Sequence, residues 1–381
     1  MRNASVSLLA IFFFGCGLAT AMAQSQIPAI KIDPAQKKVI DTPGDLTVDV
    51  AVNENTTGKD RESSILFKLP QGTSTTSMNF QQVQTKGYEL TGTLVPEAKH
   101  IGWQYNAIHS DWLRNIGFDY TEHPHCNGIG GHMDGVHLVV VNDTVLKQPV
   151  LRFDIHITPI IDGDRCSGTD RQRNELKTST NNTTWAKMQG NWDEWQRLEW
   201  KMKIPKGYQP TPNFCHIHQI KAQDGPNNGS PVITITLRAD RSGSNKQVTV
   251  EHNSSGGSGR SLGSMARVPM EEFEDEWVQI VEEMHFRHDG SYSIKITRIR
   301  DGKELLAVSK DNIDLWRRGA TFLRSKYGIY RSLAGGNLRN NPVGQSPLLK
   351  NESLFMTDFK IYEKNTNPNP TMRQEASNNA K

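Results

Sequence analysis

Short runs of alternating apolar and polar residues dominate this chain, and no long amphipathic helix pattern interrupts them. Such runs predict β-strands that each place one face in a core. Turn-forming pairs such as Asp289-Gly290 and Asp301-Gly302 separate several of them. We therefore predict an all-β fold, an antiparallel β-sandwich or β-jelly roll with few short helices, one of them around residues 311–318. Strands are expected at residues 136–141, 150–157, 196–204, 214–221, 231–237, 246–251, 277–286, 292–299 and 355–362.

The first 23 residues have the features of a signal peptide. Residues 6–14 form an apolar run too short to span a membrane, and Ala21-Met22-Ala23 supplies the small-x-small cleavage pattern. We expect a secreted or periplasmic protein after cleavage near Ala23. Cys16 offers the alternative of a lipoprotein cysteine, which the residues before it match poorly.

One sandwich domain is expected to cover most of the mature chain. We predict an N-terminal extension packed on it (residues 24–100), the jelly-roll domain itself (101–364) and a flexible tail (365–381). The 44 basic and 41 acidic residues give a net charge of +3, too balanced for a protein that coats nucleic acid or a membrane surface. We expect no nucleic-acid partner, no membrane span, and a monomer.

Three cysteines remain after the leader, namely Cys126, Cys166 and Cys215. In an oxidising compartment, one bridge and one free thiol is the simplest outcome. A Cys126–Cys166 bridge would join two loops, whereas Cys215 lies in an apolar run that favours a small buried side chain. The pairing stays open.

Charged residues alternate along residues 171–177, which predicts that Arg173, Glu175 and Lys177 share one face of a strand. Asn174 and Leu176 would then face the other way. Such a cluster is either part of a functional site or a solvent-exposed strand with cross-strand ion pairs.

Two histidines alternate within residues 214–221, so we predict that His216 and His218 share a face. They suit a general base with a hydrogen-bonding neighbour, because neutral imidazole can accept a proton near pH 7. Zinc binding is the alternative, but no third ligand follows at a diagnostic spacing, and we assign no metal ligands.

Lys326 and Tyr330 lie two residues to either side of Gly328 and are predicted to share a face with it. Glycine within a strand costs stability and is tolerated where another group must approach the backbone closely. A sugar ring would make such an approach. The alternative is a β-bulge in which Tyr330 is a packed aromatic residue.

Residues 103–137 are rich in histidine and aromatic side chains. They could form a second wall of a substrate cleft, with Asn106 and His109 as its first candidates. They could equally form a long loop whose polar groups satisfy its own backbone. The remaining alternative is a structural metal clip, with ligands drawn from His123, His125, Cys126 and His132.

Taken in chain order, these segments resemble the signature of the jelly-roll polysaccharide lyases. The Arg-x-Glu-Leu-Lys run at 173–177 is similar to Arg-x-Glu-Leu-Arg of the alginate lyases. Gly-Ile-Tyr-Arg at 328–331 resembles the end of heparin lyase I, and His-x-His-Gln-x-Lys at 216–221 resembles the short ulvan lyases. The resemblance spans about residues 150–362. It implies a secreted, endo-acting lyase that cleaves a uronic-acid polysaccharide by β-elimination, with an ulvan- or glucuronan-like polymer as the preferred substrate.

The resemblance also implies roles for individual residues. Removal of the C5 proton builds negative charge on the C6 carboxylate, which a cation must stabilise. Arg173 is the expected cation, with His218 and Tyr330 as the proton-transfer groups; in a syn elimination Tyr330 could serve as both base and acid. Glu175 would hold Arg173 or Lys177 in position, and Lys221 would join the site if a bulge rotated it inward. The expected substrate-binding residues are His216, Lys177, Lys221, Lys326, Arg331, Asn106 and His109.

Other functions remain open on the sequence alone. A non-catalytic carbohydrate-binding sandwich would share the fold and the aromatic residues, and a lyase could act on alginate or heparin-like chains instead. A glycoside hydrolase needs two carboxylates in its cleft, whereas the three motif strands display only Glu175. Elimination requires no cofactor, and a structural calcium ion is compatible with the sequence.

Overall fold

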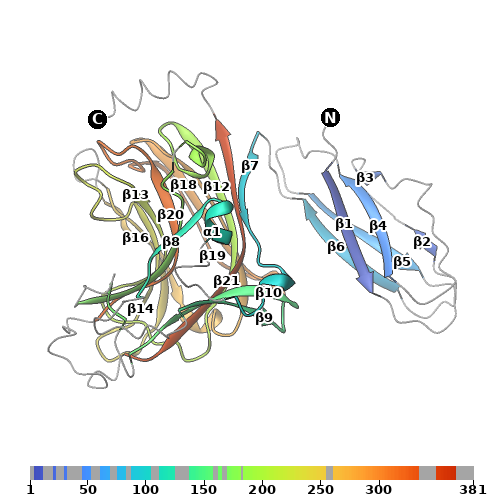
Figure 1. Cartoon of the computed structure of the whole chain (residues 1–381), viewed down its shortest axis with the longest axis horizontal. Helices are drawn as coiled ribbons and strands as arrows, with labels where there is room; N and C mark the ends of the chain where they lie inside the picture. The colour runs from blue at the N-terminus through green and yellow to red at the C-terminus, as the bar shows by residue number, and fades with distance from the viewer. Residues whose placement is uncertain are drawn as a thin grey trace. The chain divides into compact units, whose positions relative to one another are not determined.

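The chain divides into two compact units, residues 1–87 and 88–381 (Figure 1). The computed structural model describes residues 4–11, 20–22, 30–31, 45–52, 61–68, 75–82, 87–103, 111–124, 137–157, 162–164, 170–181, 183–254, 261–333 and 349–365. In the first unit the strands form two small antiparallel sheets, ordered β1-β4-β3 and β2-β5-β6. These strands are β1 (Ala4–Ile11), β2 (Thr20–Met22), β3 (Ile30–Lys31), β4 (Asp45–Val52), β5 (Arg61–Lys68) and β6 (Thr75–Gln82).

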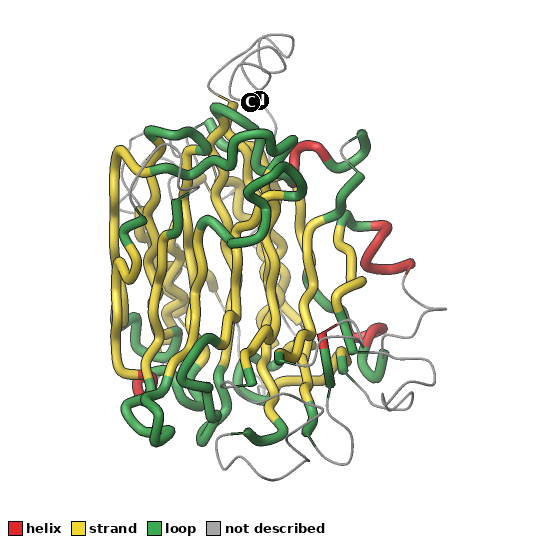
Figure 2. Tube along the Cα trace, turned by 90° about the vertical axis from the view of Figure 1, so that its left-hand side faces the viewer, coloured by secondary structure: helices red, strands yellow, loops and turns green. Residues whose placement is uncertain are grey.

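The second unit is an antiparallel β-sandwich of the jelly-roll type, as predicted, whose strands run side by side (Figure 2). One layer, the site sheet, has the order β16-β15-β14-β13-β20-β11-β8. The other, the support sheet, has the order β19-β18-β17-β12-β21-β10-β9, with β7 also paired to β21. The site sheet contains β8 (Phe118–Glu122), β11 (Arg171–Thr178), β13 (Cys215–Ala222), β14 (Ile233–Arg238), β15 (Gln247–His252), β16 (Gly263–Pro269) and β20 (Leu323–Ser332). The support sheet contains β7 (Glu89–Leu94), β9 (Leu138–Asp143), β10 (Gln148–Ile155), β12 (Glu194–Lys203), β17 (Trp277–His285), β18 (Gly290–Arg298), β19 (Glu304–Ile313) and β21 (Glu352–Asn365).

The core lies between the two sheets and is built from the inward-facing residue of each alternating pair. Aromatic rings join the layers: Tyr327 of the site sheet lies 5.3 Å from Trp200 and 4.9 Å from Phe359 of the support sheet, measured between ring centroids. All three side chains are buried. Cys215 is a buried free thiol, as its apolar run predicted, and it contacts the Tyr208 hydroxyl.

Within the described residues helices are few and short, as predicted: α1 (Asp111–Asn115) and the 3₁₀ turns η2 (Ala98–His100), η4 (Ala186–Met188) and η5 (Met270–Glu272). None of the helices in the described ranges is long and apolar enough to span a membrane. The helix expected at residues 311–318 is wrong. There β19 continues to Ile313, and the following Leu315 and Trp316 are buried in the core. Consecutive side chains are buried in this segment, whereas a helix would bury only one stripe of its surface. The resulting run of apolar residues led to the wrong prediction of a helix.

The sandwich begins earlier than the expected boundary at residue 101, since Glu89–Leu94 pairs with β21. Packing of the first unit on the sandwich stays a prediction, as do the signal peptide and the secreted location. The cysteines Cys126 and Cys166, the candidates Asn106 and His109, and the tail from residue 366 onward lie outside the described residues.

Candidate active site

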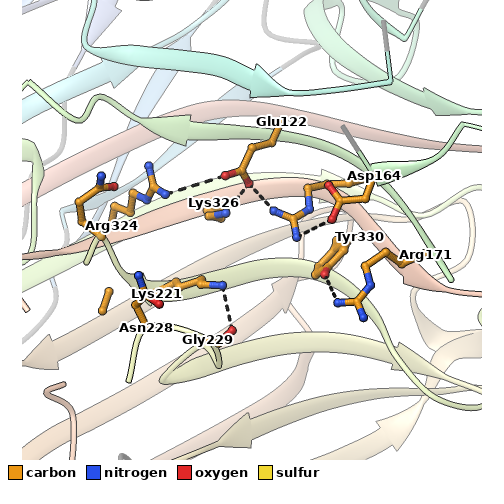
Figure 3. A pocket seen from close by; sticks show the side chains of 12 residues that line it. Glu122, Asp164, Arg171, Lys221, Asn228, Gly229, Arg324, Lys326 and Tyr330 are labelled. Atoms are coloured by element: carbon orange, nitrogen blue, oxygen red, sulfur yellow. Dashed lines mark hydrogen bonds and ion pairs between the residues drawn. The ribbon is translucent and has the colours of Figure 1, made fainter. Parts of the chain in front are cut away.

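A cleft of about 510 Å³ lies against the central strands of the site sheet (Figure 3). Among the residues that the structure describes, the charged lining is mostly basic, with five cationic and two acidic side chains, and Tyr330 supplies a phenol. The basic residues come from three strands, β11, β13 and β20. The charged lining residues are Arg171, Arg173, Lys221, Arg324, Lys326, Glu122 and Asp164. The cleft is therefore locally basic although the net charge of the whole chain is only +3, and a basic cleft suits an anionic ligand.

Strand register explains why these side chains meet. Arg173 lies opposite Tyr330 and Lys177 lies opposite Lys326 in the β11–β20 pair. Because side chains two residues apart share a face, the alternating charges of both strands point to the same side of the sheet. The faces predicted for β11 and for Lys326 and Tyr330 are confirmed, but the solvent-exposed alternative for β11 is wrong, because every residue from Gln172 to Thr178 is buried.

Glu122, on the edge strand β8, lines the cleft and is the acidic residue around which its cations gather. Its carboxylate accepts hydrogen bonds from Lys326 Nζ and, at 2.8 Å, from Arg173 Nη1, and it lies 3.5 Å from Lys177 Nζ. Burial alone would raise the pKa of Glu122, but Lys326, Arg173 and Lys177 more than reverse that and hold it well below its usual range. Glu122 is therefore an ionised counter-charge that fixes three cations in place.

Glu175 lies close to Arg173, as its predicted positioning role requires. Its fully buried carboxylate accepts a hydrogen bond from Gln219 and lies 3.8 Å from Arg173 Nε and 3.9 Å from Lys326 Nζ. Lys177, by contrast, is not among the cleft-lining residues. It reaches Glu122 and Asp119, the latter at 3.6 Å, and so supports the cleft from below.

Tyr330 is held between two guanidinium groups. Arg171 Nη1 donates to its hydroxyl at 2.9 Å, and the Arg173 guanidinium carbon lies 3.9 Å from the ring centroid. A second bond from Arg173 Nη2 to Asp164, at 3.0 Å, fixes that guanidinium. The phenol oxygen is therefore oriented in the cleft and already receives one charged hydrogen bond.

A β-bulge in β13 separates the two histidines. His216 lies opposite Thr236 of β14 and His218 lies opposite the next residue, Ile235, so β13 contains one extra residue at this point. On its other side, His216 lies opposite Tyr330 of β20 and His218 lies opposite Tyr327. The prediction that His216 and His218 share a face is therefore wrong. The His218 ring lies in the core, fully buried, 4.6 Å from the Trp200 ring, with Nε2 3.0 Å from the Glu282 carboxylate. Its place in the core removes it from the candidates for the base.

The same bulge rotates Lys221 into the cleft, which is the condition under which the sequence predicted Lys221 in the site. Lys221 lies opposite Arg324 on β20 and lines the cleft, where its Nζ donates to the Gly229 carbonyl at 2.9 Å. Burial lowers its pKa to about 8, and the nearby charges of Lys326 and Arg173 contribute to the shift. A lysine with this pKa is about one-tenth neutral at pH 7 and about half neutral at pH 8, and its neutral form can accept a proton.

His216 faces a second cleft, of about 600 Å³, that lies against β13, β14 and β15. Its ring stacks on Phe214, with centroids 4.7 Å apart, and lies 6.0 Å from the Tyr330 ring. Burial lowers the pKa of His216 to about 3, so its imidazole is neutral at physiological pH. It can offer a neutral hydrogen bond to a ligand that extends past Tyr330, but no positive charge.

Arg331 does not reach the cleft, so its predicted role in substrate binding is wrong. It lies opposite Gln172 on the core-facing side of the β11–β20 pair. Its fully buried guanidinium donates to the Gln172 side chain and to the Lys350 carbonyl, each at 2.8 Å. A residue next to Tyr330 along a strand must point away from it, and Arg331 therefore has a structural role.

Gly328 is required by the neighbouring strand and not by a ligand. Its φ of +137° is rare for residues with a side chain, and a Cβ placed on it would lie 2.2 Å from the Asn174 carbonyl oxygen. We expect Gly328→Ala to lower the free energy of unfolding by about 2–4 kcal/mol, from strain and overpacking together. Urea unfolding of the purified variant measures this, and an unchanged midpoint would contradict the close approach of β11 to Gly328.

The position of His218 gives a second testable prediction. His218→Gln removes a buried partner of Glu282 and should lower the free energy of unfolding by about 1–3 kcal/mol. Because the ring lies on the core side of the sheet, turnover of the folded variant at saturating substrate should remain close to that of the wild type. A large loss of kcat with unchanged stability would return His218 to the catalytic residues.

Glu122, Asp164 and Arg171 line the cleft with charged groups but were not assigned a role from the sequence. Glu122 ends the alternating run Phe118–Glu122, a strand signal that the neighbouring histidine-rich stretch obscured. Asp164 lies in a turn, where no periodic pattern exists. Arg171 belongs to the same alternating series as Arg173 and could have been found by extending that series by two residues.

No protein-family model matches the chain, and no curated protein matches it in sequence. Solved structures with a similar fold include the endo-β-1,4-glucuronan lyase of the fungus Trichoderma reesei, with 15% identity, 64% of this chain and 94% of that chain covered, and a TM-score of 0.41. The family 7 alginate lyase A1-II' has 12% identity, with 66% of this chain and 95% of that chain covered and a TM-score of 0.42. The alginate lyase PA1167 of Pseudomonas aeruginosa has 14% identity, with 64% of this chain and 97% of that chain covered and a TM-score of 0.38. The activity of this chain is therefore argued from the side chains of its own cleft.

Proposed function

We propose that this protein is a polysaccharide lyase that cleaves a uronic-acid polymer by β-elimination. The observation that carries the proposal is the placement of Lys221 and Tyr330, a lysine of lowered pKa and a hydrogen-bonded phenol, in one basic cleft. Figure 3 shows both side chains among the cationic groups that line it. A base, an acid and cations for a carboxylate are the three components that β-elimination at a uronate needs.

The proposed reaction uses these groups in one concerted or stepwise sequence. The neutral Lys221 amine takes the C5 proton, and the electrons of that C–H bond form the C4–C5 double bond. The C4–O4 bond breaks, and the Tyr330 hydroxyl gives its proton to the departing O4. Negative charge that develops on the C6 carboxylate during proton removal is stabilised by the fixed cations of the cleft, Arg173 among them.

The positions of base and acid favour a particular stereochemistry. Lys221 and Tyr330 project from the same face of the site sheet, on the adjacent strands β13 and β20, so both side chains point toward a polymer that lies along this face. Proton removal and leaving-group protonation from one side give a syn elimination. In glucuronate and in mannuronate, which share their configuration at C4 and C5, H5 and O4 lie on the same side of the ring, so both sugars fit a syn elimination. This supports a polymer of glucuronate or mannuronate units, and of these we propose a glucuronan- or ulvan-like polymer as the substrate.

Hydrolysis is disfavoured by the state of the acidic residues. An inverting or retaining hydrolase needs a carboxylic acid that stays protonated until it protonates the leaving group. Glu122 instead has a lowered pKa and is bound by Lys326 and Arg173, and the Asp164 carboxylate is bound by Arg173. Each of the two carboxylates in the described lining of the cleft is therefore paired with cations.

The proposal is tested by mixing the purified protein separately with glucuronan, ulvan, alginate, heparin and pectate. Ultraviolet absorbance follows the conjugated double bond that elimination creates, and a reducing-end assay follows every chain cleavage. We expect both signals to rise together with glucuronan or ulvan. New reducing ends without absorbance would indicate hydrolysis, and polymer binding without either signal would indicate a carbohydrate-binding module; each result would overturn the proposal.

A further inference from the structure

A buried group of metal-ligating side chains lies outside the cleft, where strands β9 and β10 meet. His137 immediately precedes β9, His156 immediately follows β10, and Asp162 lies in the segment that follows. Because the two strands pair antiparallel, with Leu138 opposite Phe153, the end of β10 returns to the start of β9. The ligand atoms of the three side chains all lie within 4.8 Å of one another.

The spacing of these ligand atoms fits a cation site. Asp162 lies between the two imidazoles: one carboxylate oxygen is 3.1 Å from His137 Nε2, and the other is 3.1 Å from His156 Nδ1. Ligand atoms on a tetrahedral zinc ion lie about 3.3 Å apart, given the usual metal–ligand distances. The His137 and Asp162 side chains are fully buried, while His156 keeps 24% of its side-chain surface exposed.

The chemistry of the donors selects the class of ion. Two imidazole nitrogens and one carboxylate match zinc and similar transition metals, whereas calcium takes six to eight oxygen ligands. Three protein ligands leave a fourth coordination position, which a water molecule can fill. The structural calcium ion that the sequence admits is thus not the ion that this group fits.

The backbone around these ligands is fixed by β11, a strand of the active site. Asn174 Nδ2 donates to the His137 carbonyl at 2.6 Å, and Gln172 Nε2 donates to the His156 carbonyl at 2.9 Å. The link continues through the chain itself, since Gly163 forms a β-bridge with Gln172 and the adjacent Asp164 binds Arg173 at 3.0 Å. Such support of ligands by a surrounding hydrogen-bond shell is typical of metal sites.

We propose that His137, His156 and Asp162 bind one zinc-class divalent cation, and that this ion fixes residues 162–164 so that Asp164 is held against Arg173. The ion is structural, because its ligands do not line the cleft. The inference concerns metal binding by this chain and does not depend on the proposed reaction.

The test measures metal directly. Full-length protein is treated with a chelator, dialysed, incubated with zinc chloride and freed of unbound metal, and its zinc content is measured by plasma mass spectrometry. We expect about one zinc per chain, a higher Tm after zinc is added, and visible d–d absorption bands when cobalt(II) replaces zinc. His156→Gln should lose all three signals. Because the His156 side chain is partly exposed, we expect this variant to fold.

The matched control is His288→Gln. His288 pairs with Asp314 at 2.7 Å and has 23% of its side-chain surface exposed, close to the values for His156, but it is not a member of the group. Circular dichroism confirms that both variants are folded. Retention of the zinc in His288→Gln and its loss in His156→Gln would support the site. No zinc in the wild type, or equal zinc in all three proteins, would overturn it and leave a hydrogen-bonded His–Asp–His triad.

Discussion

Lys221→Arg is expected to lower kcat/KM on the polymer substrate by about 10²–10⁴-fold, the usual contribution of a general base. Arginine keeps the positive charge and much of the length of the side chain, but it does not give up its proton near neutral pH. A residue that only bound the substrate carboxylate would therefore tolerate the change, whereas a base would not. Initial rates of absorbance increase at several polymer concentrations measure the effect.

The pH dependence of the wild type provides the complementary result. Lys221 must be neutral to accept the C5 proton, and its pKa is lowered to about 8. kcat/KM should therefore rise as the pH rises toward 8 and level off above that value, as the amine becomes fully deprotonated. Activity of Lys221→Arg within about tenfold of the wild type, or a profile flat from about pH 6 to 9, would contradict the assignment of Lys221 as the base.

Tyr330→Phe is expected to have an effect of similar size, a fall in kcat of about 10²–10⁴-fold, because it removes the proton given to the departing O4. The ring remains, so the Arg173 contact at 3.9 Å from its centroid is kept. KM should change much less than kcat, since the lost interaction acts mainly in the transition state.

Tyr327→Phe is the matched control for Tyr330→Phe. It makes the same substitution on the same strand, but the Tyr327 side chain lies on the opposite face, in the core between the sheets. We expect near wild-type turnover for Tyr327→Phe in folded protein. Equal losses in both variants would mean that the hydroxyl groups act through stability, and the role of Tyr330 as acid would be wrong.

Much of this arrangement follows from strand periodicity alone. The alternation of Arg173, Glu175 and Lys177, and of Lys326 and Tyr330, was enough to predict which side chains share a face. Register then brings the two sets together across β11 and β20. An alternating pattern is a local property, and local properties can be obtained from one sequence.

The errors arose where the structure departs from simple alternation. The bulge in β13 sends His218 into the core and Lys221 into the cleft, and one inserted residue reverses the face of everything after it. The acidic partner Glu122 comes from an edge strand that is distant from β11 in the sequence. The other acidic partner, Asp164, comes from a turn that lies outside the alternating pattern of β11. Such pairings depend on tertiary contacts, which no periodic pattern in the chain specifies.

The central claim is that this cleft cleaves its polymer by elimination, and the products of a short digest in water enriched in oxygen-18 test it most directly. In elimination no water is added, so the new non-reducing ends carry a C4–C5 double bond and the oligosaccharides from a glucuronan digest contain no oxygen-18 from cleavage. Mass spectrometry should show each new-ended product lighter by one water than the corresponding saturated oligosaccharide. Saturated products that carry one oxygen-18 per cleavage would contradict the account.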